Sequence, residues 1–361
     1  MHRVRQVLAA AVAVALLVSG CDRGANDTAV TTIGLLSAAL ADTAEASEAS
    51  SYRESISFGV VWNIEGEEIS TGLDEKRPVV VSEISPERDY SRFNMGTFMK
   101  QLFGFLPPGF DELEIEVWSD DERAVMDTTA LQQLADAEPR IDLGPMAPGV
   151  FSINWAAIEA DSTELKAALS GSSSPDLSEM AKSLPAALIT IEHTSNDPST
   201  FVGTTTSARL NEALGWNTEE EARYDAADFG MDFSADPDEL AELFLDFYET
   251  NTVEVVIELD ERGLLSVLWT DEDLSGIFRI IAESEDLRAE FSEEEAEVFD
   301  SIEFRMVTRV AYEPDADIEV PLPPPTDEDR TEEWRELLVV PNLDGWAWVH
   351  PLGFDVQEWA A

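Results

Sequence analysis

The sequence predicts an α+β protein: a curved antiparallel β-sheet, shaped as a half-barrel, with helices covering its apolar concave face. Three observations predict this fold. Hydrophobic and polar residues alternate over several short segments, acidic turns join these segments in pairs, and segments of helical periodicity lie between the pairs. Alternation with short connections is typical of antiparallel strands that have one wet face. Continuous apolar strands, which are typical of a parallel sheet, do not occur.

The first twenty residues have the three parts of an export signal. Basic residues lie within positions 2–5, twelve uninterrupted apolar residues occupy positions 7–18, and Ser19 and Gly20 follow. Twelve residues make about 18 Å of helix, which is too short for a hydrocarbon core of about 30 Å. We therefore predict a cleaved signal peptide over residues 1–20 and not a membrane span.

The residues Val18-Ser19-Gly20-Cys21 resemble a bacterial lipobox, and Cys21 is the only cysteine of the chain. The resemblance implies that Cys21 carries a diacylglycerol and an acyl chain such as palmitate, with residues 21–29 as a tether. Each buried methylene contributes about 0.8 kcal/mol, so several chains anchor a protein durably. The expected location is the extracytoplasmic face of the cell membrane. The alternative is an ordinary secretory signal that contains a cysteine.

The charge balance excludes one large class of partner. The chain has 75 acidic residues against 22 Lys and Arg, a formal charge of −53. Nucleic-acid binding depends on clustered Lys and Arg, so no nucleic acid is expected as a partner. The same excess repels anionic headgroups, so the anchor on Cys21 must hold the protein to the membrane.

Changes in the spacing of hydrophobic residues along the sequence predict the first helices and strands. Hydrophobic residues at helical spacing predict an amphipathic helix over residues 30–45. Alternation then predicts a strand over residues 56–64 and a hairpin across the turn at 65–67. A strand over 79–84 and a second hairpin, with its turn at 119–122, come next. Short helices are expected over 178–184 and 208–214.

The clearest helix is expected over residues 237–250, where Pro237 and Asp238 suit a helix start. A third hairpin follows, from residue 253 to residue 269, then a helix with an acidic face over 287–299 and a strand over 302–312. Prolines at 321–325 end the expected domain, residues 30–325.

A C-terminal extension, residues 326–361, contains four of the nine tryptophans. Tryptophan combines a large apolar ring with one N–H donor, which suits interfaces. Two interpretations of the extension stay open: it folds back onto its own domain, or it docks on a membrane or a partner protein.

Several segments together resemble a known family. They are the strand start Ser51-Tyr52-Arg53, the acidic hairpin EVWSDDER at 116–123, the hairpin at 253–264 and the exit at 317–321. In their order they resemble the actinobacterial envelope lipoproteins of the LppX/LprG type, which share a LolA-like half-barrel. The resemblance covers about residues 30–325. It implies an internal apolar cavity that carries lipids. Two departures are a longer middle of the chain and the unmatched residues 330–361.

The resemblance implies that the inward side chains of the first strand, and those of the third hairpin with the helix before it, line this cavity. The candidates are Ile56, Phe58, Val60, Trp62, Ile64, Phe244, Phe247, Val253, Val255 and Ile257. The same periodicity fits a densely packed core without a cavity. Two functions therefore stay open: a carrier of lipids or other apolar ligands, and a non-carrier scaffold or sensor that acts through protein contacts, for which the Trp-rich tail is the candidate surface.

The sequence contains no complete catalytic or metal-binding motif of the kinds considered below. Beyond the signal, His193 and His350 are the two histidines, and no Gly-x-Ser-x-Gly or Cys/His metal spacing occurs. Asp271 and Asp273 imitate the start of a calcium-binding loop together with Ser275 and Gly276. The twelfth position of that loop is Ala282, where a bidentate Glu is required. We therefore expect no enzyme activity, no cofactor and no metal.

Overall fold

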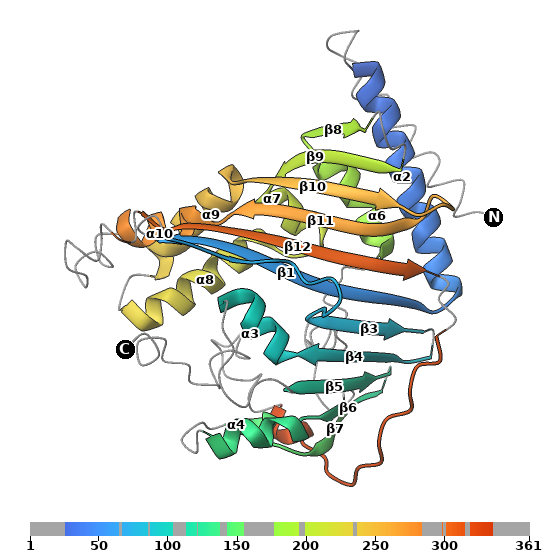
Figure 1. Ribbon diagram of the computed structural model, residues 1–361, viewed down its shortest axis with the longest axis vertical. Helices are drawn as coiled ribbons and strands as arrows, with labels where there is room; N and C mark the ends of the chain where they lie inside the picture. The colour runs from blue at the N-terminus through green and yellow to red at the C-terminus, as the bar shows by residue number, and fades with distance from the viewer. Residues whose placement is uncertain are drawn as a thin grey trace. The chain divides into compact units, whose positions relative to one another are not determined.

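Figure 1 shows a computed structural model of the chain. The structure describes residues 26–64, 67–85, 87–103, 113–120, 122–137, 143–154, 177–194, 199–233, 237–283, 298, 301–314 and 318–334. The expected signal peptide, Cys21 and most of the tether lie outside these residues. The predicted fold class is confirmed: the chain is α+β, with a curved, unclosed antiparallel sheet structure and several helices.

The chain forms two compact units, and each is described by itself. Unit 1 comprises Met1–Ser47 and Pro175–Asp300, and unit 2 comprises Glu48–Ser174 and Ser301–Ala361. In the described residues of both units, the strands pair antiparallel with their neighbours.

The sheet of unit 2 is organised around its longest strand. Its strands are β1 (Tyr52–Ile64), β2 (Glu67–Thr71), β3 (Val80–Ile84), β4 (Asp89–Asn94), β5 (Glu114–Ser119), β6 (Arg123–Asp127), β7 (Val150–Asn154) and β12 (Glu303–Pro314). Their order is β7-β6-β5-β4-β3-β1-β12 (Figure 1). β1 pairs with β12 along nearly its whole length, whereas β3 and β2 share its other side.

The core of unit 2 lies on one face of β5, β6 and β7. Because side chains alternate across a strand, Ile115 and Val117 of β5 point to the same face as Phe151 and Ile153 of β7. The helices of this unit are α3 (Met95–Phe103) and α4 (Gln132–Ala137), with 3₁₀ turns at Thr129–Leu131 and Gly144–Met146. Leu131 and the fully buried Trp334 complete the core.

Unit 1 has four strands in the order β11-β10-β9-β8. They are β8 (Thr190–His193), β9 (Thr200–Thr206), β10 (Thr252–Leu259) and β11 (Leu265–Asp273). The helices of this unit are α2 (Asn26–Ala49), α6 (Leu177–Ala187), α7 (Ser207–Ala213), α8 (Thr218–Phe233), α9 (Pro237–Thr250) and α10 (Ser275–Glu283). Helices α8, α9 and α10 share an apolar cluster that includes Ala226, Leu240 and Ile280.

Buried hydroxyl groups fix two helices to this sheet. Thr43 of α2 accepts a hydrogen bond from the backbone N–H of Leu265 at 2.8 Å. Thr205 of β9 donates to the carbonyl oxygen of Ala187, at the end of α6, at 2.8 Å. Both hydroxyls are almost fully buried, so each bond satisfies a polar group that water does not reach.

All three predicted hairpins are confirmed, as β1–β2, β5–β6 and β10–β11. The helices expected near residues 30, 178, 208 and 237 are also present. The helix expected over 287–299 lies, except for residue 298, outside the described residues. Helices α3, α4, α8 and α10 were not predicted. No helix in the described part of the chain is long and apolar enough to cross a membrane.

The segment after the prolines returns to unit 2 and lies along the edge strand β7. The N–H of Ser152 donates to the carbonyl of Glu328 at 2.8 Å, and the N–H of Arg330 donates to the carbonyl of Ser152 at 2.9 Å. Ser152 and Asp329 thereby form a parallel bridge. Trp334, which follows, is 1% exposed. The other tryptophans of the extension, Trp346, Trp348 and Trp359, lie outside the described residues.

Candidate functional site

Half of the predicted cavity residues lie on β1, and the pairing of β1 with β12 shows which residues are their neighbours in the sheet. The register of β1 and β12 forms the cross-strand pairs Ile56 with Val310, Phe58 with Thr308, Val60 with Met306 and Trp62 with Phe304. Because alternate residues share a face, these eight side chains form one surface, which we call the β1–β12 face. Seven of the eight are apolar. The side chain of Ile64, the last residue of β1, is outside the described residues.

The β1–β12 face is only partly covered. Ile56 and Val60 are buried, at 7% and 0% exposure. Phe58 and Trp62 are half-buried, and so are all four β12 members of the face. A fully packed core would bury such side chains completely, so part of this apolar surface stays accessible.

Aromatic contacts order this face. The rings of Trp62 and Phe304 stack with their centroids 4.1 Å apart. Phe98 of α3 meets Phe58 edge to face at 6.3 Å and also contacts Phe93 at 5.8 Å. Such contacts contribute about 0.5–1.5 kcal/mol beyond area burial, and they hold large rings in fixed positions.

Helix α3 is fixed against β1 by one buried side chain. Gln101 accepts a hydrogen bond from the backbone N–H of Phe58 at 3.0 Å and donates to the carbonyl of Arg77 at 3.2 Å. Asn94 precedes the first residue of the helix, and its side-chain oxygen accepts a hydrogen bond from the N–H of Thr97 at 2.6 Å. These bonds position Phe98 over the β1–β12 face.

A polar row, which the sequence reasoning did not single out, shares this face of the sheet. Glu54 pairs directly with Tyr312 on β12 and with Ser82 on β3, and Ser82 pairs with Ser91 on β4. All four are at most 4% exposed, and the hydroxyl of Ser91 donates to that of Ser82 at 3.0 Å. Glu54 is separated from Ile56 and Phe58 by even numbers of residues, so the alternation along the strand placed it on the same face. This spacing could have identified Glu54 from the sequence.

The other five predicted cavity residues belong to unit 1, and most of them are core residues. Phe244, Val253, Val255 and Ile257 are each at most 1% exposed. Phe247 is half-buried, and its ring lies so close to Gly276 that an added Cβ there would be 2.4 Å from it. These side chains fill the interior of unit 1.

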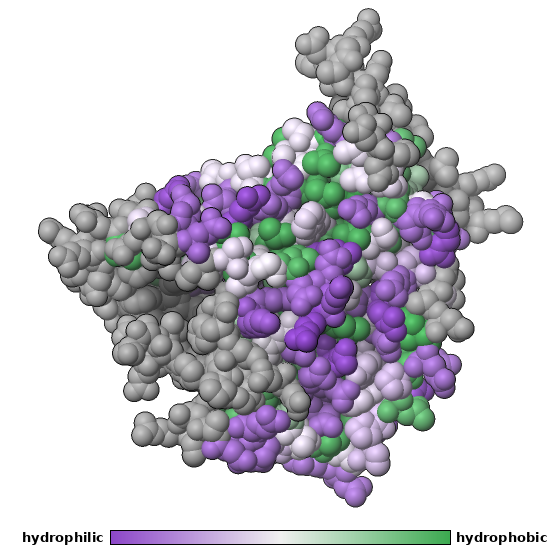
Figure 2. All heavy atoms as spheres, in the orientation of Figure 1, coloured by the Kyte–Doolittle hydropathy of each residue, from purple (hydrophilic) through white to green (hydrophobic). Residues whose placement is uncertain are grey.

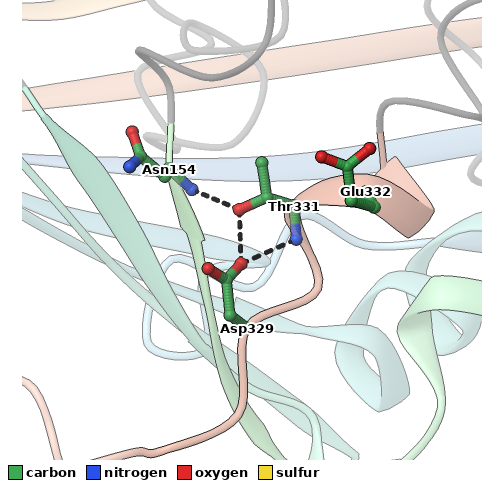
Figure 3. Close-up of a pocket in the computed structure, with 4 residues that line it drawn as sticks. All are labelled: Asn154, Asp329, Thr331 and Glu332. Atoms are coloured by element: carbon green, nitrogen blue, oxygen red, sulfur yellow. Dashed lines mark hydrogen bonds between the residues drawn. The ribbon is translucent and has the colours of Figure 1, made fainter.

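Two pockets in the described residues have polar walls. The first, about 280 Å³, lies in unit 2 between Asn154, Asp329, Thr331 and Glu332 (Figure 3). The carboxylate of Asp329 accepts from the N–H and the hydroxyl of Thr331, at 2.9 and 2.5 Å. That hydroxyl in turn accepts from the N–H of Asn154 at 2.8 Å. The pocket therefore marks where the C-terminal segment attaches to β7.

The second pocket, about 310 Å³, lies in unit 1 between α7, α8 and α9. Glu212, Glu219 and Glu249 line it together with Ala208, Asn217, Thr218 and Leu245. Neither pocket contains a predicted cavity residue.

Half-buried acidic groups lie elsewhere in unit 1. The carboxylate of Glu272 accepts hydrogen bonds from the hydroxyl of Ser207 and, at 3.0 Å, from the amide of Asn251. Burial raises the pKa of Glu272, and these two hydrogen bonds partly oppose the rise. Ser207 is 3% exposed, so the group joins β11, α7 and the end of α9 and offers no reachable nucleophile.

A second acidic pair lies between α8 and α9. The hydroxyl of Tyr248 donates to the carboxylate of Asp225. Burial, followed by the charge of Asp225, raises the pKa of Tyr248 well above its usual range. Burial also raises the pKa of Glu221, with Asp225 and Glu220 adding to the effect. Partial burial, together with neighbouring negative charges, accounts for both directions.

The candidate calcium loop has another structural role. Asp273 ends β11, and its carboxylate accepts from the N–H and the hydroxyl of Ser275, at 3.0 and 2.5 Å, at the start of α10. Within the described residues, no group of three or more His, Cys, Asp or Glu side chains is placed to hold a metal ion. His193 lies in β8 with its ring 5.0 Å from that of Phe201, whereas His350 is outside the described residues.

Comparisons with known proteins do not assign a family. No family model matches the chain, and no curated protein matches it. Among solved structures, 5-dimethylallyl tryptophan synthase from Streptomyces coelicolor was found at 6% identity and a TM-score of 0.14, over 76% of this chain and 83% of that chain. A likeness of that size carries no argument about this chain.

Proposed function

We propose that this chain is a membrane-anchored extracytoplasmic lipoprotein that binds lipid chains or other apolar ligands non-covalently. The observation that carries the proposal is the β1–β12 face. Six of its eight side chains are half-buried, and five of those six are apolar, Phe58, Trp62, Phe304, Met306 and Val310. The predicted lipobox at Cys21 supports the location.

The physical basis of binding is the burial of apolar surface. A chain of about 16 carbons gains about 0.8 kcal/mol for each methylene removed from water. Large rings held in place by Phe98 and by mutual stacking lose little conformational freedom when a ligand covers them. The free energy gained by burying a ligand on this face would therefore be reduced little by the ordering of these side chains.

The test uses a pair of variants on opposite faces of the same two strands. Trp62→Ser with Phe304→Ser removes the stacked pair from the β1–β12 face. Val61→Ser with Val307→Ser makes a matched change on the opposite face, where both valines are half-buried. Uptake of a fluorescent fatty acid by the soluble Cys21→Ser protein should weaken about tenfold in the first variant and stay at the wild-type level in the second.

Native mass spectrometry of the same protein adds a direct readout, because a carrier should retain a co-purifying amphiphile. The proposal is wrong if the Cys21→Ser protein takes up no fatty acid and carries no amphiphile. Equal uptake by both variant pairs would also exclude the β1–β12 face as the binding surface.

The anchor has a separate test. The wild-type chain should fractionate with membranes, and the full-length Cys21→Ser chain should be released once its signal is processed. Membrane retention of the Cys21→Ser protein after removal of its signal would contradict lipidation at this residue without bearing on ligand binding.

A second candidate function is a scaffold or sensor that works through protein contacts. The observation that favours it is the exposure of large apolar side chains on the described surface. They are Leu35, Ile189, Trp216, Trp269 and Leu322, at 54, 55, 47, 39 and 73% exposure. One of them, Trp269, lies on a sheet face of unit 1 whose chemistry is specific enough to name a partner.

A further inference from the structure

The sheet of unit 1 has one buried face and one face that meets solvent. On β10, Val253, Val255 and Ile257 are buried, whereas the alternate residues Glu254 and Glu258 are exposed and Val256 is half-buried. The register carries this alternation to β9 and β11. We call the solvent side of β8–β11 the outer face.

An apolar stripe crosses the middle of the outer face. Trp269 of β11 lies opposite Val256 of β10, and Val256 lies opposite Val202 of β9. Trp269 is 39% exposed, and both valines are half-buried. In Figure 2 hydrophobic residues lie among hydrophilic ones over this part of unit 1. A large exposed aromatic residue beside smaller apolar ones is typical of the core of a protein interface.

The rim of the stripe is acidic. Glu254 and Glu258 flank Val256 on β10, so both lie diagonally across from Trp269, and Glu192 of β8 lies beside Val202. The register also sets Glu254 directly opposite Asp271. The strands β8–β11 contain no Lys and no Arg.

The two exposed carboxylates of Glu254 and Glu258 can attract the same cation, because they lie on either side of Val256. The aromatic ring of Trp269 beside them adds attraction for that cation.

We propose that the outer face binds a basic segment of a partner protein. An Arg or Lys of that segment lies over the indole of Trp269, with its charge between Glu254 and Glu258, and an adjacent apolar side chain covers Val256 and Val202. Arg fits best, because its flat guanidinium stacks on an aromatic ring and pairs with carboxylates at its edge. The proposal rests on the second candidate function and is independent of ligand binding on the β1–β12 face.

Other occupants fit the outer face less well. A second copy of the chain would bring a formal charge of −53 to an acidic surface. An anionic membrane would be repelled in the same way. A basic partner would instead be attracted before contact, which raises its association rate.

The test uses a synthetic probe and the Cys21→Ser protein. The probe is a peptide of alternating Arg and Leu, compared with an otherwise identical peptide of Glu and Leu and with a peptide of alternating Arg and Ser. Calorimetry at low salt should show saturable binding of the Arg–Leu peptide, weaker binding of the Arg–Ser peptide and none of the Glu–Leu peptide. Raising the salt concentration should weaken binding.

Matched variants locate the site. Trp269→Ala should weaken the dissociation constant about tenfold, and Trp216→Ala, which removes another exposed tryptophan of unit 1, should leave it unchanged. Glu254→Gln with Glu258→Gln should weaken binding and flatten its salt dependence. Glu239→Gln with Glu242→Gln, an equal charge change at exposed positions of α9, should have little effect.

Three outcomes would overturn the proposal. One is no saturable binding of the Arg–Leu peptide to the wild-type protein. Another is an equal loss in the Trp269 and Trp216 variants, and the third is an equal loss in the two glutamine pairs, which would indicate bulk charge alone. Fatty-acid uptake measured on the same variants should stay at the wild-type level, so failure of this proposal is distinguishable from failure of the carrier.

Discussion

At the scale of single residues, Gln101 closes a gap in the sheet of unit 2. On one side of β1, β3 pairs as far as Ile56 and β2 begins at Val60. The N–H of Phe58 lies between these two ladders and donates instead to the side chain of Gln101, which is 4% exposed. A buried N–H without an acceptor costs about 1–3 kcal/mol.

We therefore expect Gln101→Ala to lower the free energy of unfolding by about 1–3 kcal/mol, because it leaves the N–H of Phe58 and the carbonyl of Arg77 without their partner. Urea denaturation followed by circular dichroism measures the change. Lys100→Ala, at the exposed neighbouring position of α3, is the control and should change stability little. Equal stability of the two variants would contradict this role of Gln101.

Glu272 makes a second prediction at the residue scale. Its pKa is raised in the folded chain, so the protonated carboxyl is the form that the fold favours. The stabilisation is therefore complete below the unfolded pKa of about 4.5 and is lost as the pH rises through the higher folded value. Glu272→Gln keeps an acceptor oxygen for Ser207 and Asn251 but cannot ionise.

The free energy of unfolding of the Glu272→Gln chain should therefore increase relative to that of the wild type as the pH rises from 4 to 8. Chemical denaturation at a series of pH values tests this expectation. The exposed Glu242→Gln in α9 is the matched control and should keep the wild-type pH dependence. If the free energies of unfolding of Glu272→Gln and the wild type depend on pH in the same way, burial does not raise the pKa of this carboxyl.

At the scale of elements, alternation and turn chemistry predicted the hairpins. The hairpin β10–β11 turns at Asp260, whose carboxylate accepts from the N–H groups of Arg262 and Leu264, at 2.8 and 2.9 Å. Gly263 has a φ of +82°, a conformation that favours glycine. Such local signals are readable in the sequence because they do not depend on distant parts of the chain.

Elements that depend on distant packing were not predictable. Helix α8 is rich in acidic residues, and the described side chains that it contributes to the cluster shared with α9, Ala222 and Ala226, are small. Its hydrophobic stripe is therefore weak. The alternation on β1 predicted five residues on one face, but the sequence did not indicate that Phe304, Met306 and Val310 would join them, since register is a property of the pairing.

The C-terminal segment, residues 326–334, covers the exposed edge of β7. Arg330 donates to the carbonyls of Pro145 and Ala147, at 2.9 and 2.6 Å, and its guanidinium lies 4.0 Å from the ring centroid of Phe151. Together with the bonds at Ser152 and the buried Trp334, it covers the edge of β7. An uncovered edge strand is a template for aggregation.

A chain that ends at residue 325 should therefore lose at least about 3 kcal/mol of stability in unit 2, the typical cost of removing a buried Trp, and should aggregate. A chain that ends at residue 334 keeps these contacts and should stay soluble and near wild-type stability. Thermal melts and the soluble fraction measure both. If the two truncations behave alike, the segment 326–334 does not stabilise β7.

At the scale of the whole molecule, charge opposes folding. A formal charge of −53 from 75 acidic and 22 basic residues repels itself in the compact state more than in the extended chain. Salt shortens the range of that repulsion, from about 10 Å at 0.1 M to about 3 Å at 1 M. The described ion pairs are mostly exposed, such as Arg223 with Glu219 at 3.6 Å. Exposed pairs contribute little to stability, so the screening of these pairs by salt costs little.

We therefore expect NaCl between 0.05 and 0.5 M to raise the melting temperature by several degrees, in contrast to a protein held together by surface ion pairs. Glu249→Lys should raise it at low salt as well, because it reverses one charge at the last turn of α9, which has no basic residue. Its gain should shrink as salt is added. Calorimetric scans at each salt concentration measure both effects, and a melting temperature that falls with salt would show that attraction between charges, and not repulsion, dominates the fold.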